Sequence, residues 1–323
     1  MHPSGTAAGL GLLSAASWGG SDFAGGLGAR RAPTLLVVAS GHFVSLLVLL
    51  ALCLVSHLAP PARHDLLFAA IGGFEGALGL ALFYRALAMG AMGLTAALTG
   101  LLTALVPVLF SLFRDGLPTL LTSAGLAMGL AAIWLIAHSP AVKGTEQTTA
   151  NPAVRHPFHA LGEECGKPQF STQPVPEEST NSESKPTATP PAALLLGALA
   201  GLAFGAQLIF FKLAAGGSIL WVLTSTRAAG VTAMLLVLLV MPPTRAWRGF
   251  WLFGILAGSL DTLGNLFYIQ TTRYGRLDVA AMVCSLYPAA TILLAAMVLR
   301  EWPTPRQFAG IALALAAVAL LSA

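Results

Sequence analysis

The sequence repeats one pattern of residues after about 185 positions, and this repeat limits what the chain can fold into. Gly90 recurs as Gly275, and Pro118 recurs as Pro303, both at a shift of 185. A period this long in an apolar chain is typical of a duplicated membrane unit and not of a solenoid. In duplicated transporters the substrate site lies between the two units. Matches at a shift of 186 pair Gly72 with Gly258, Glu75 with Asp261 and Gly19 with Gly205.

The composition requires a lipid environment. Hydrophobic residues make up 56% of the 323 residues, charged residues make up 9%, and the mean hydropathy is +0.78. So few charges do not cover the surface of a water-soluble domain of this length. The formal net charge of +4 arises from basic residues that are scattered through short loops. We therefore expect a lipid bilayer, and no nucleic acid, as a partner.

Apolar runs that are long enough to cross a bilayer follow one another along the chain. A transmembrane helix needs about 20 residues, and no run alternates apolar and polar residues as a barrel strand does. We therefore predict an all-α integral membrane protein with ten transmembrane helices. The predicted helices are Ala7–Leu27, Thr34–Leu58, Leu66–Ala88, Leu94–Phe113, Leu117–Ala137, Ala192–Ala215, Ile219–Met241, Phe250–Thr271, Asp278–Leu299 and Arg306–Leu321.

One polar stretch separates the first five runs from the last five. It is rich in Pro, Ser, Thr and Glu and too poor in apolar residues to fold, so we interpret it as disordered. His156, His159 and Cys165 in this stretch are too loosely spaced to predict a metal site. Because five is an odd number, the second repeat enters the membrane from the opposite side, which makes the repeats inverted. The predicted domains are a first repeat at 1–138, a linker at 139–191 and a second repeat at 192–323.

Ionisable residues inside transmembrane helices are costly, so each one is a candidate functional residue. The candidates are Asp22, Glu75, Asp261 and Arg227. The repeat alignment makes Glu75 and Asp261 equivalent, so inverted repeats bring both towards one axis. Two carboxylates beside one cavity either bind a cation or carry a proton, because burial favours the protonated form. In the structural alternative each acid forms an ion pair, and Arg227 serves either such a pair or an anion site.

Polar stripes on otherwise apolar helices predict which faces line a cavity, because lipid would penalise them. The stripe residues are Trp18, Ser21 and Asp22 in the first helix and Asp261, Asn265 and Tyr268 in the eighth. Gln207 occupies the position of Ser21 in the second repeat and is predicted to line the same cavity.

Pro107 and Pro288 lie inside the fourth and ninth predicted helices. A proline inside a helix leaves the carbonyl four residues earlier without its hydrogen bond. In a membrane such carbonyls are tolerated where they meet protein or water. The two predicted kinks therefore either line a pathway or serve packing alone.

Enzyme motifs are absent from the sequence. It contains no H-E-x-x-H, no Walker loop and no G-x-S-x-G. We therefore expect no enzymatic activity, no metal and no cofactor. Without a module that hydrolyses ATP, any transport has to run on a gradient.

Several short motifs occur in a defined order along the chain. They are Trp18-Gly19-Gly20-Ser21, Tyr84-Arg85-Ala86-Leu87-Ala88, Arg227, Leu286-Tyr287-Pro288 and Arg300-Glu301-Trp302. With these motifs the chain resembles the drug/metabolite transporter superfamily, EamA-like type, everywhere except in the linker. The resemblance implies ten helices in two inverted repeats, cytoplasmic termini and export or exchange of small metabolites. It also implies a central cavity that is lined by the first, third, fourth, sixth, eighth and ninth helices and includes Trp18, Glu75, Gln207, Asp261 and Tyr287.

Together these patterns predict a gradient-driven secondary transporter of a small metabolite that works by alternating access. We expect it in the plasma membrane, which is the inner membrane in a bacterium. Glu75 and Asp261 are predicted to couple transport to protonation, while Trp18, Tyr268 and Tyr287 shape the site. The alternative is a membrane enzyme or accessory subunit that acts on lipid-linked substrates through intramembrane acids. The substrate, the coupling ion and the oligomeric state, monomer or homodimer, are left open by the sequence.

Overall fold

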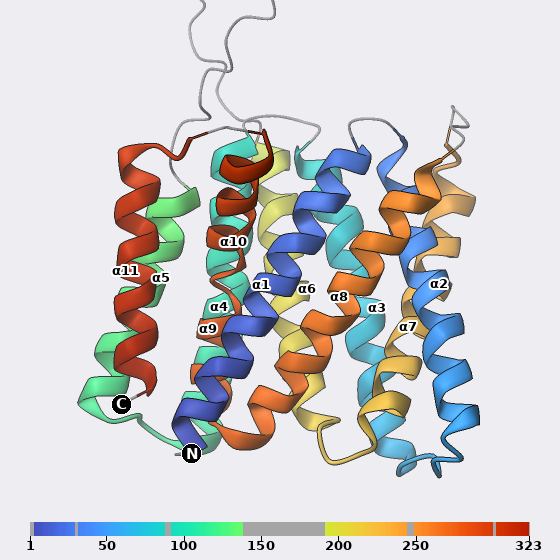
Figure 1. Ribbon diagram of the computed structural model, residues 1–323, viewed down its shortest axis with the longest axis horizontal. Coiled ribbons are helices and arrows are strands. Elements are labelled where there is room, and N and C mark those ends of the chain that lie inside the picture. Colours follow the sequence, from blue (N-terminus) through green and yellow to red (C-terminus); the bar gives the residue numbers. More distant parts are fainter. Residues whose placement is uncertain are drawn as a thin grey trace, which may run out of the picture. The chain divides into compact units, whose positions relative to one another are not determined.

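The computed structural model describes residues 3–29, 32–87, 92–137, 191–243, 249–299 and 302–322. The predicted linker, with its two histidines and Cys165, lies outside the described residues. Within the described ranges every regular element is a helix (Figure 1). The elements are α1 (Pro3–Ala29), α2 (Thr34–Val55), α3 (Arg63–Leu87), α4 (Met92–Asp115), α5 (Leu120–Ala137), α6 (Pro191–Leu213), α7 (Ile219–Val240), α8 (Phe250–Tyr274), α9 (Leu277–Cys284), α10 (Tyr287–Leu294), the π-helical turn η1 (Ala295–Leu299) and α11 (Pro305–Ser322).

These elements confirm the predicted all-α membrane fold. Eight described segments are long and apolar enough to cross a membrane, and α5 contributes a shorter apolar helix. The helix α1 has 27 residues, which corresponds to about 40 Å, but its glycines, serines and Asp22 lower its hydropathy. The ninth predicted helix is a single span, Leu277–Val298, that is divided between α9, α10 and η1.

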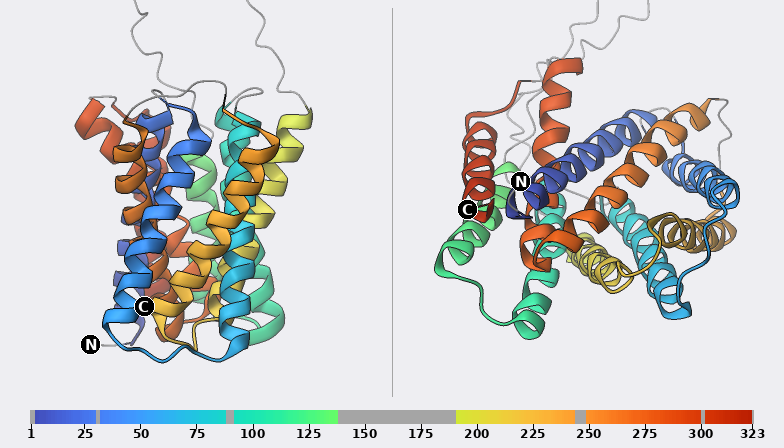
Figure 2. Two further views of the ribbon diagram at one scale, coloured as in Figure 1. Left: turned by 90° about the vertical axis from the view of Figure 1, so that its right-hand side faces the viewer. Right: turned by 60° about the horizontal axis from the view of Figure 1, so that its bottom comes forward.

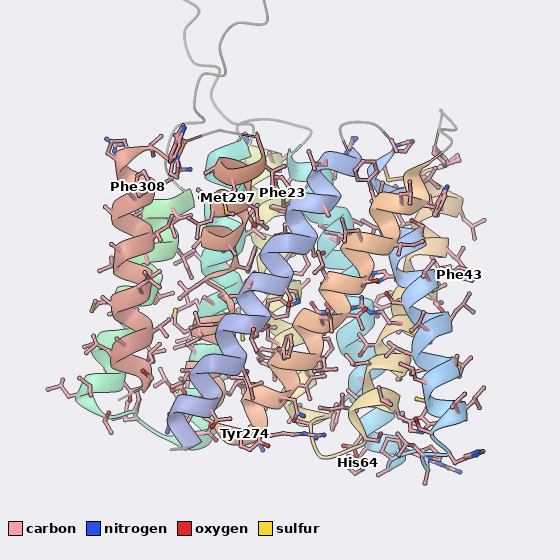
Figure 3. All side chains as sticks on the ribbon, in the orientation of Figure 1. Phe23, Phe43, His64, Tyr274, Met297 and Phe308 are labelled. Atoms are coloured by element: carbon pink, nitrogen blue, oxygen red, sulfur yellow. The ribbon has the colours of Figure 1, made fainter. Side chains whose placement is uncertain are left out.

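Large apolar side chains cover the outside of the bundle. Phe43, Met297 and Phe308 are each more than half exposed, and Figure 3 shows Phe43 and Phe308 at the two sides of the bundle. In water such a surface would aggregate, whereas in a bilayer it meets lipid chains. The chain is therefore a multi-pass membrane protein.

The packing of the helices follows the predicted repeat. Exchanging the repeats replaces α1 by α6, α2 by α7, α3 by α8 and α4 by the α9–α10 segment. The extensive contact of α1 with α8 then becomes that of α6 with α3, and the contact of α2 with α8 becomes that of α7 with α3. Likewise, α1 packs on α10 as α6 packs on α4, and α5 packs on α11. Two views of the helices are given in Figure 2.

Close backbone contacts set the alignment of the repeats in this region. A Cβ atom on Gly73 would collide with the backbone of Thr226, and one on Gly258 would collide with the backbone of Gly41. Exchanging the repeats converts the first contact into the second at a shift of 185 for both residues. The predicted shift of 186 is therefore wrong for α3 and α8. The counterpart of Asp261 is Gly76, and Glu75 corresponds to Leu260 instead.

Pro288 interrupts the ninth span, while Pro107 does not interrupt α4. The residues Ser285 and Leu286 separate α9 from α10, and Pro288 stands in the first turn of α10. Pro107 lies within the continuous helix α4. A Cβ on Gly205 would approach the carbonyl of Leu102, as one on Gly19 would approach the carbonyl of Tyr287. These contacts align Leu102 with Tyr287, so the two prolines are not repeat equivalents.

Candidate functional site

A cavity of about 360 Å³ lies between the two repeats. Its lining residues run from the middle of the bundle to the end at which α1 finishes and α2 begins. We call this the open end; the opposite end, which carries both termini in Figure 1, is the terminus end. The helices α2 and α7 contribute to the lining in addition to those implied by the family resemblance. Eight predicted site residues line the cavity: Trp18, Ser21, Asp22, Gln207, Arg227, Asp261, Asn265 and Tyr287.

A chain of polar contacts crosses the cavity wall from α1 to α2. The Trp18 Nε1–H donates to Asn265 Oδ1 at 3.0 Å, and the Asn265 amide donates to Asp261 Oδ2 at 3.4 Å. The same Asp261 oxygen forms an ion pair with Arg227 Nη2 at 2.6 Å. Arg227 Nη1 then donates to His42 Nδ1 at 2.9 Å. The four-residue spacing of Asp261 and Asn265 stacks them on one face of α8, which makes this chain continuous.

The Arg227–Asp261 pair combines a buried cation with a partly exposed acid. The Arg227 side chain is 1% exposed, and the Asp261 side chain is 35% exposed. Removing one partner of a buried pair leaves a charge that is uncompensated, which costs about 3–5 kcal/mol. Asp261 therefore holds Arg227 in place and also presents carboxylate surface to the cavity.

Asp22 differs from Asp261 because it has no fixed partner. No described side chain forms a hydrogen bond or an ion pair with Asp22. Its side chain is exposed and lines the cavity, close enough to Asp261 for the two charges to interact. An acid in this setting is free to exchange a proton or to meet a cationic group.

Two of the residues that were predicted to line the cavity lie outside its lining. Tyr268 is fully buried, and its hydroxyl donates to the carbonyl of Leu208 at 2.9 Å. Its ring centroid lies 5.8 Å from that of Trp18, so Tyr268 supports the wall from behind. Glu75 is half-buried on α3 and does not line the cavity. Its neighbour Gly76 lines the cavity instead, as the one-residue correction of the repeat alignment requires.

His42 is a site residue that the sequence reasoning did not select. It lines the cavity and contacts Arg227, its own repeat counterpart at a shift of 185. The repeat in the sequence could have identified His42, because His42 occupies the position equivalent to Arg227, an ionisable residue inside a transmembrane helix. In an inverted repeat, equivalent residues on α2 and α7 meet where the two helices pack on each other.

The break before α10 brings a second aromatic residue into the site. Tyr287 is the first residue of α10, and its ring contacts Trp18 edge-on at 6.4 Å. The hydroxyl of Thr291 donates to the carbonyl of Gly19 at 3.2 Å. Pro288 therefore directs the start of a helix towards α1, which explains how the ninth span reaches the cavity.

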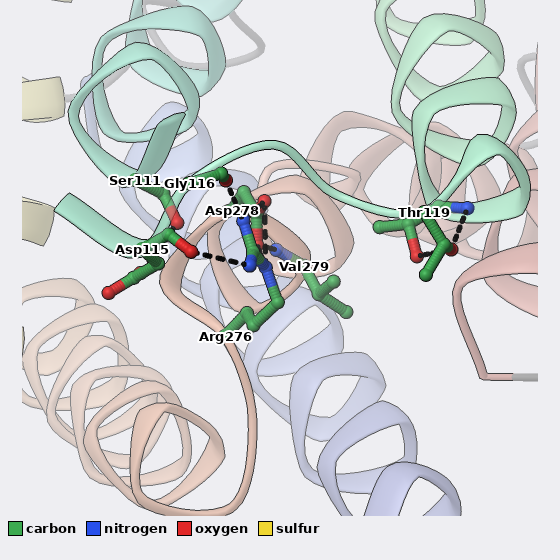
Figure 4. Close-up of polar contacts among 8 residues, drawn as sticks. Ser111, Asp115, Gly116, Thr119, Arg276, Asp278 and Val279 are labelled. Atoms are coloured by element: carbon green, nitrogen blue, oxygen red, sulfur yellow. Dashed lines mark hydrogen bonds and ion pairs between the residues drawn. The ribbon is translucent and has the colours of Figure 1, made fainter. Parts of the chain in front are cut away.

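The terminus end of the bundle is fastened by two arginines. Figure 4 shows Arg276 joining the α4–α5 loop through the carbonyls of Asp115, at 3.2 Å, and Gly116, at 2.8 Å, and binding Asp278. The hydrogen bond to Asp278 raises the pKa of Arg276 above its ordinary value, so this clamp persists at physiological pH. Arg273 donates in the same way to Ala215 and to a second carbonyl of the α6–α7 loop. No described residue of these loops lines the cavity.

The described residues offer no evident metal centre. They contain no group of three or more His, Cys, Asp or Glu side chains that could hold an ion. Cys53 and Cys284 are buried free thiols within the described part of the chain.

Comparisons with known proteins give a family match for the second part of the chain and a shared fold for the whole. Residues 191–323 match the model of the EamA-like transporter family. No curated protein matches the sequence. Twenty-three chains of solved structures match. One of them, described only as "Crystal structure of protein", has a TM-score of 0.68 and 17% sequence identity, and the match covers 98% of this chain and 96% of that one. At this identity the match shows a shared fold.

Proposed function

We propose that the chain is a member of the drug/metabolite transporter superfamily and works as a gradient-driven secondary transporter that moves a small metabolite by alternating access. Members of this family are membrane transporters and not enzymes. We further propose that the protein resides in the plasma membrane and exports or exchanges its substrate there.

One observation carries this proposal: among the described residues, the lining of the cavity between the repeats runs from the middle of the bundle to one of its ends. Its lining reaches the open end, while Arg273 and Arg276 fasten the loops of the terminus end. A site that communicates with one side at a time is the arrangement that alternating access requires. Inverted repeats supply the second state, because each repeat can adopt the conformation of the other.

We propose that the acids of the cavity link transport to a proton gradient. Asp22 is the acid that is free to exchange a proton, whereas Asp261 exchanges one only when it leaves Arg227. Glu75 remains a predicted coupling residue, although it lies outside the cavity lining. The aromatic rings of Trp18 and Tyr287 provide the apolar wall against which a small metabolite packs.

Reconstitution in liposomes tests the proposal. We expect uptake or exchange of one metabolite class from a mixed pool, and we expect an imposed pH gradient to change its rate. The double substitution Asp22→Asn with Asp261→Asn should abolish the effect of the gradient, because amides take up no proton, while Glu75→Gln should retain it. The opposite pattern would assign coupling to Glu75. A folded protein that moves no metabolite of a broad panel would refute transport and favour the enzyme or accessory-subunit alternative.

A further inference from the structure

The buried guanidinium of Arg227 is incompletely coordinated. Nη1 contacts His42, and Nη2 lies beside one oxygen of Asp261. Among the described residues, neither Nε nor Nη2 has a hydrogen-bond partner of acceptable geometry. An arginine side chain carries five N–H donors, and buried donors are normally satisfied. Arg227 therefore keeps donors in reserve while it lines the cavity.

The donors in reserve form one edge of the guanidinium. The Nε–Nη2 edge is the one on which arginine binds a carboxylate through two parallel hydrogen bonds. Asp261 reaches this edge with Oδ2 alone, and that oxygen is shared with the amide of Asn265. With more than a third of its side chain exposed, Asp261 has room to move aside.

We propose that the transported substrate carries a carboxylate that binds the Nε–Nη2 edge of Arg227 and displaces Asp261, which then takes up one proton from the cavity water. This proposal rests on the proposed function, because it assigns the substrate class to the same cavity. The balance is simple: one carboxylate and one proton enter together, so the charge of the site does not change. Asp261 occupies the anion site when no substrate is present.

The charges around Asp261 explain why a proton accompanies the substrate. Three ionisable side chains on adjacent helices face Asp261. They are Asp22 on α1, His42 on α2 and Arg227 on α7. Once the substrate neutralises Arg227, Asp261 and Asp22 are two carboxylates without a cation, and proximity then favours protonation of one of them. The charged residues of α6 and α9 are engaged at the terminus end. Lys212 on α6 donates to the carbonyl of Thr272, and Asp278 on α9 pairs with Arg276.

Binding of acids and of their amides to the purified protein in lipid nanodiscs tests the proposal. The probes are benzoate with benzamide, and phenylalanine with phenylalaninamide. We expect the wild type to bind at least one acid and not its amide. Between about pH 5.5 and 7.5 its affinity should rise by up to about tenfold for each unit of falling pH, as linkage to one proton requires.

Substitutions at the two residues separate the proposal from a structural role. Asp261→Asn should bind the acid at least as tightly as the wild type, because a neutral amide does not compete for Arg227 as a carboxylate does. Its binding should depend little on pH, because an amide takes up no proton. Arg227→Lys keeps the charge without the two-pronged edge and should weaken binding more than tenfold. Asp115→Asn, the same change at the terminus end, should bind as the wild type does. Thermal melting checks that each variant is folded.

The Asp22→Asn variant distinguishes two classes of substrate that carry a carboxylate, amino acids and simple organic acids. Weaker binding of phenylalanine with unchanged binding of benzoate identifies an amino acid, whose ammonium group meets Asp22. Equal effects on both probes identify a simple organic acid. Equal binding of acid and amide, binding of neither acid, or an unchanged pH slope in Asp261→Asn would overturn the proposal. Transport of a compound without a carboxylate would overturn it while leaving the proposed function intact.

Discussion

At the scale of single residues, the site depends on side chains that orient other side chains. Trp18 lines the cavity, and its direction is set by a hydrogen bond to Asn265 and by the ring of Tyr268 behind it. The sequence pattern placed Trp18, Asn265 and Tyr268 on polar stripes but did not separate the residue that meets a ligand from the one that supports it. Burial makes that distinction, because Tyr268 is 0% exposed.

Tyr268 should therefore affect stability more than binding when only its hydroxyl is removed. Tyr268→Phe deletes the hydrogen bond to Leu208 and should cost about 1 kcal/mol, while the ring still supports Trp18. Tyr268→Ala removes the ring and should lower the free energy of unfolding by about 3–5 kcal/mol. It should also weaken substrate binding, because Trp18 loses its support. Thermal melting and a binding titration measure the two effects. A loss of affinity in Tyr268→Phe with unchanged stability would place the hydroxyl in the binding site.

At the scale of elements, the loops of the terminus end are joined by two arginines whose repeat-equivalent positions in the sequence are not arginine. With the shift of 185, the positions equivalent to Arg273 and Arg276 are Ala88 and Ala91. The carbonyls that Arg276 binds belong to the loop after α4, so the clamp joins one repeat to the other. These hydrogen bonds stabilise the packing of the terminus end.

Arg276→Ala should loosen the terminus end without unfolding the bundle. Charge-assisted hydrogen bonds contribute about 1.5–3 kcal/mol, so local opening should become at least about tenfold more frequent. The buried thiol of Cys284 reports this opening through its rate of maleimide labelling, with Cys53 and Cys165 replaced by serine. Arg306→Ala, at an exposed arginine near the start of α11, is the matched control. Equal labelling rates in both variants would show that the clamp does not hold this end closed.

At the scale of the whole molecule, the two repeats are related by contacts as well as by sequence. The repeats make two equivalent contacts: α3 crosses α7 at Gly73, and α8 crosses α2 at Gly258. In both crossings one backbone touches another, which leaves no side chain that can move aside for a new methyl group.

Alanine at either crossing should therefore destabilise the protein to a similar degree. We expect Gly73→Ala and Gly258→Ala each to cost at least about 1–3 kcal/mol, as overpacking does. Gly9→Ala is the control, because nothing lies within 4 Å of a Cβ there, and it should stabilise its helix by about 0.5–1 kcal/mol. Melting temperatures of the three variants test the equivalence. A large difference between the two crossings would contradict the alignment at a shift of 185.

The sequence by itself determined the fold class and most of the helices, because a bilayer demands about 20 apolar residues for each crossing whatever the helices pack against. It also determined which helix faces are polar, since lipid penalises those faces wherever they occur. Only the tertiary structure decided which acids share the site. A shift of one residue in the repeat turns a side chain by about 100° around its helix, which moved the counterpart of Asp261 from Glu75 to Gly76. The pairing of Arg227 with Asp261 and His42 likewise joins three helices, and no spacing within one helix records such a contact.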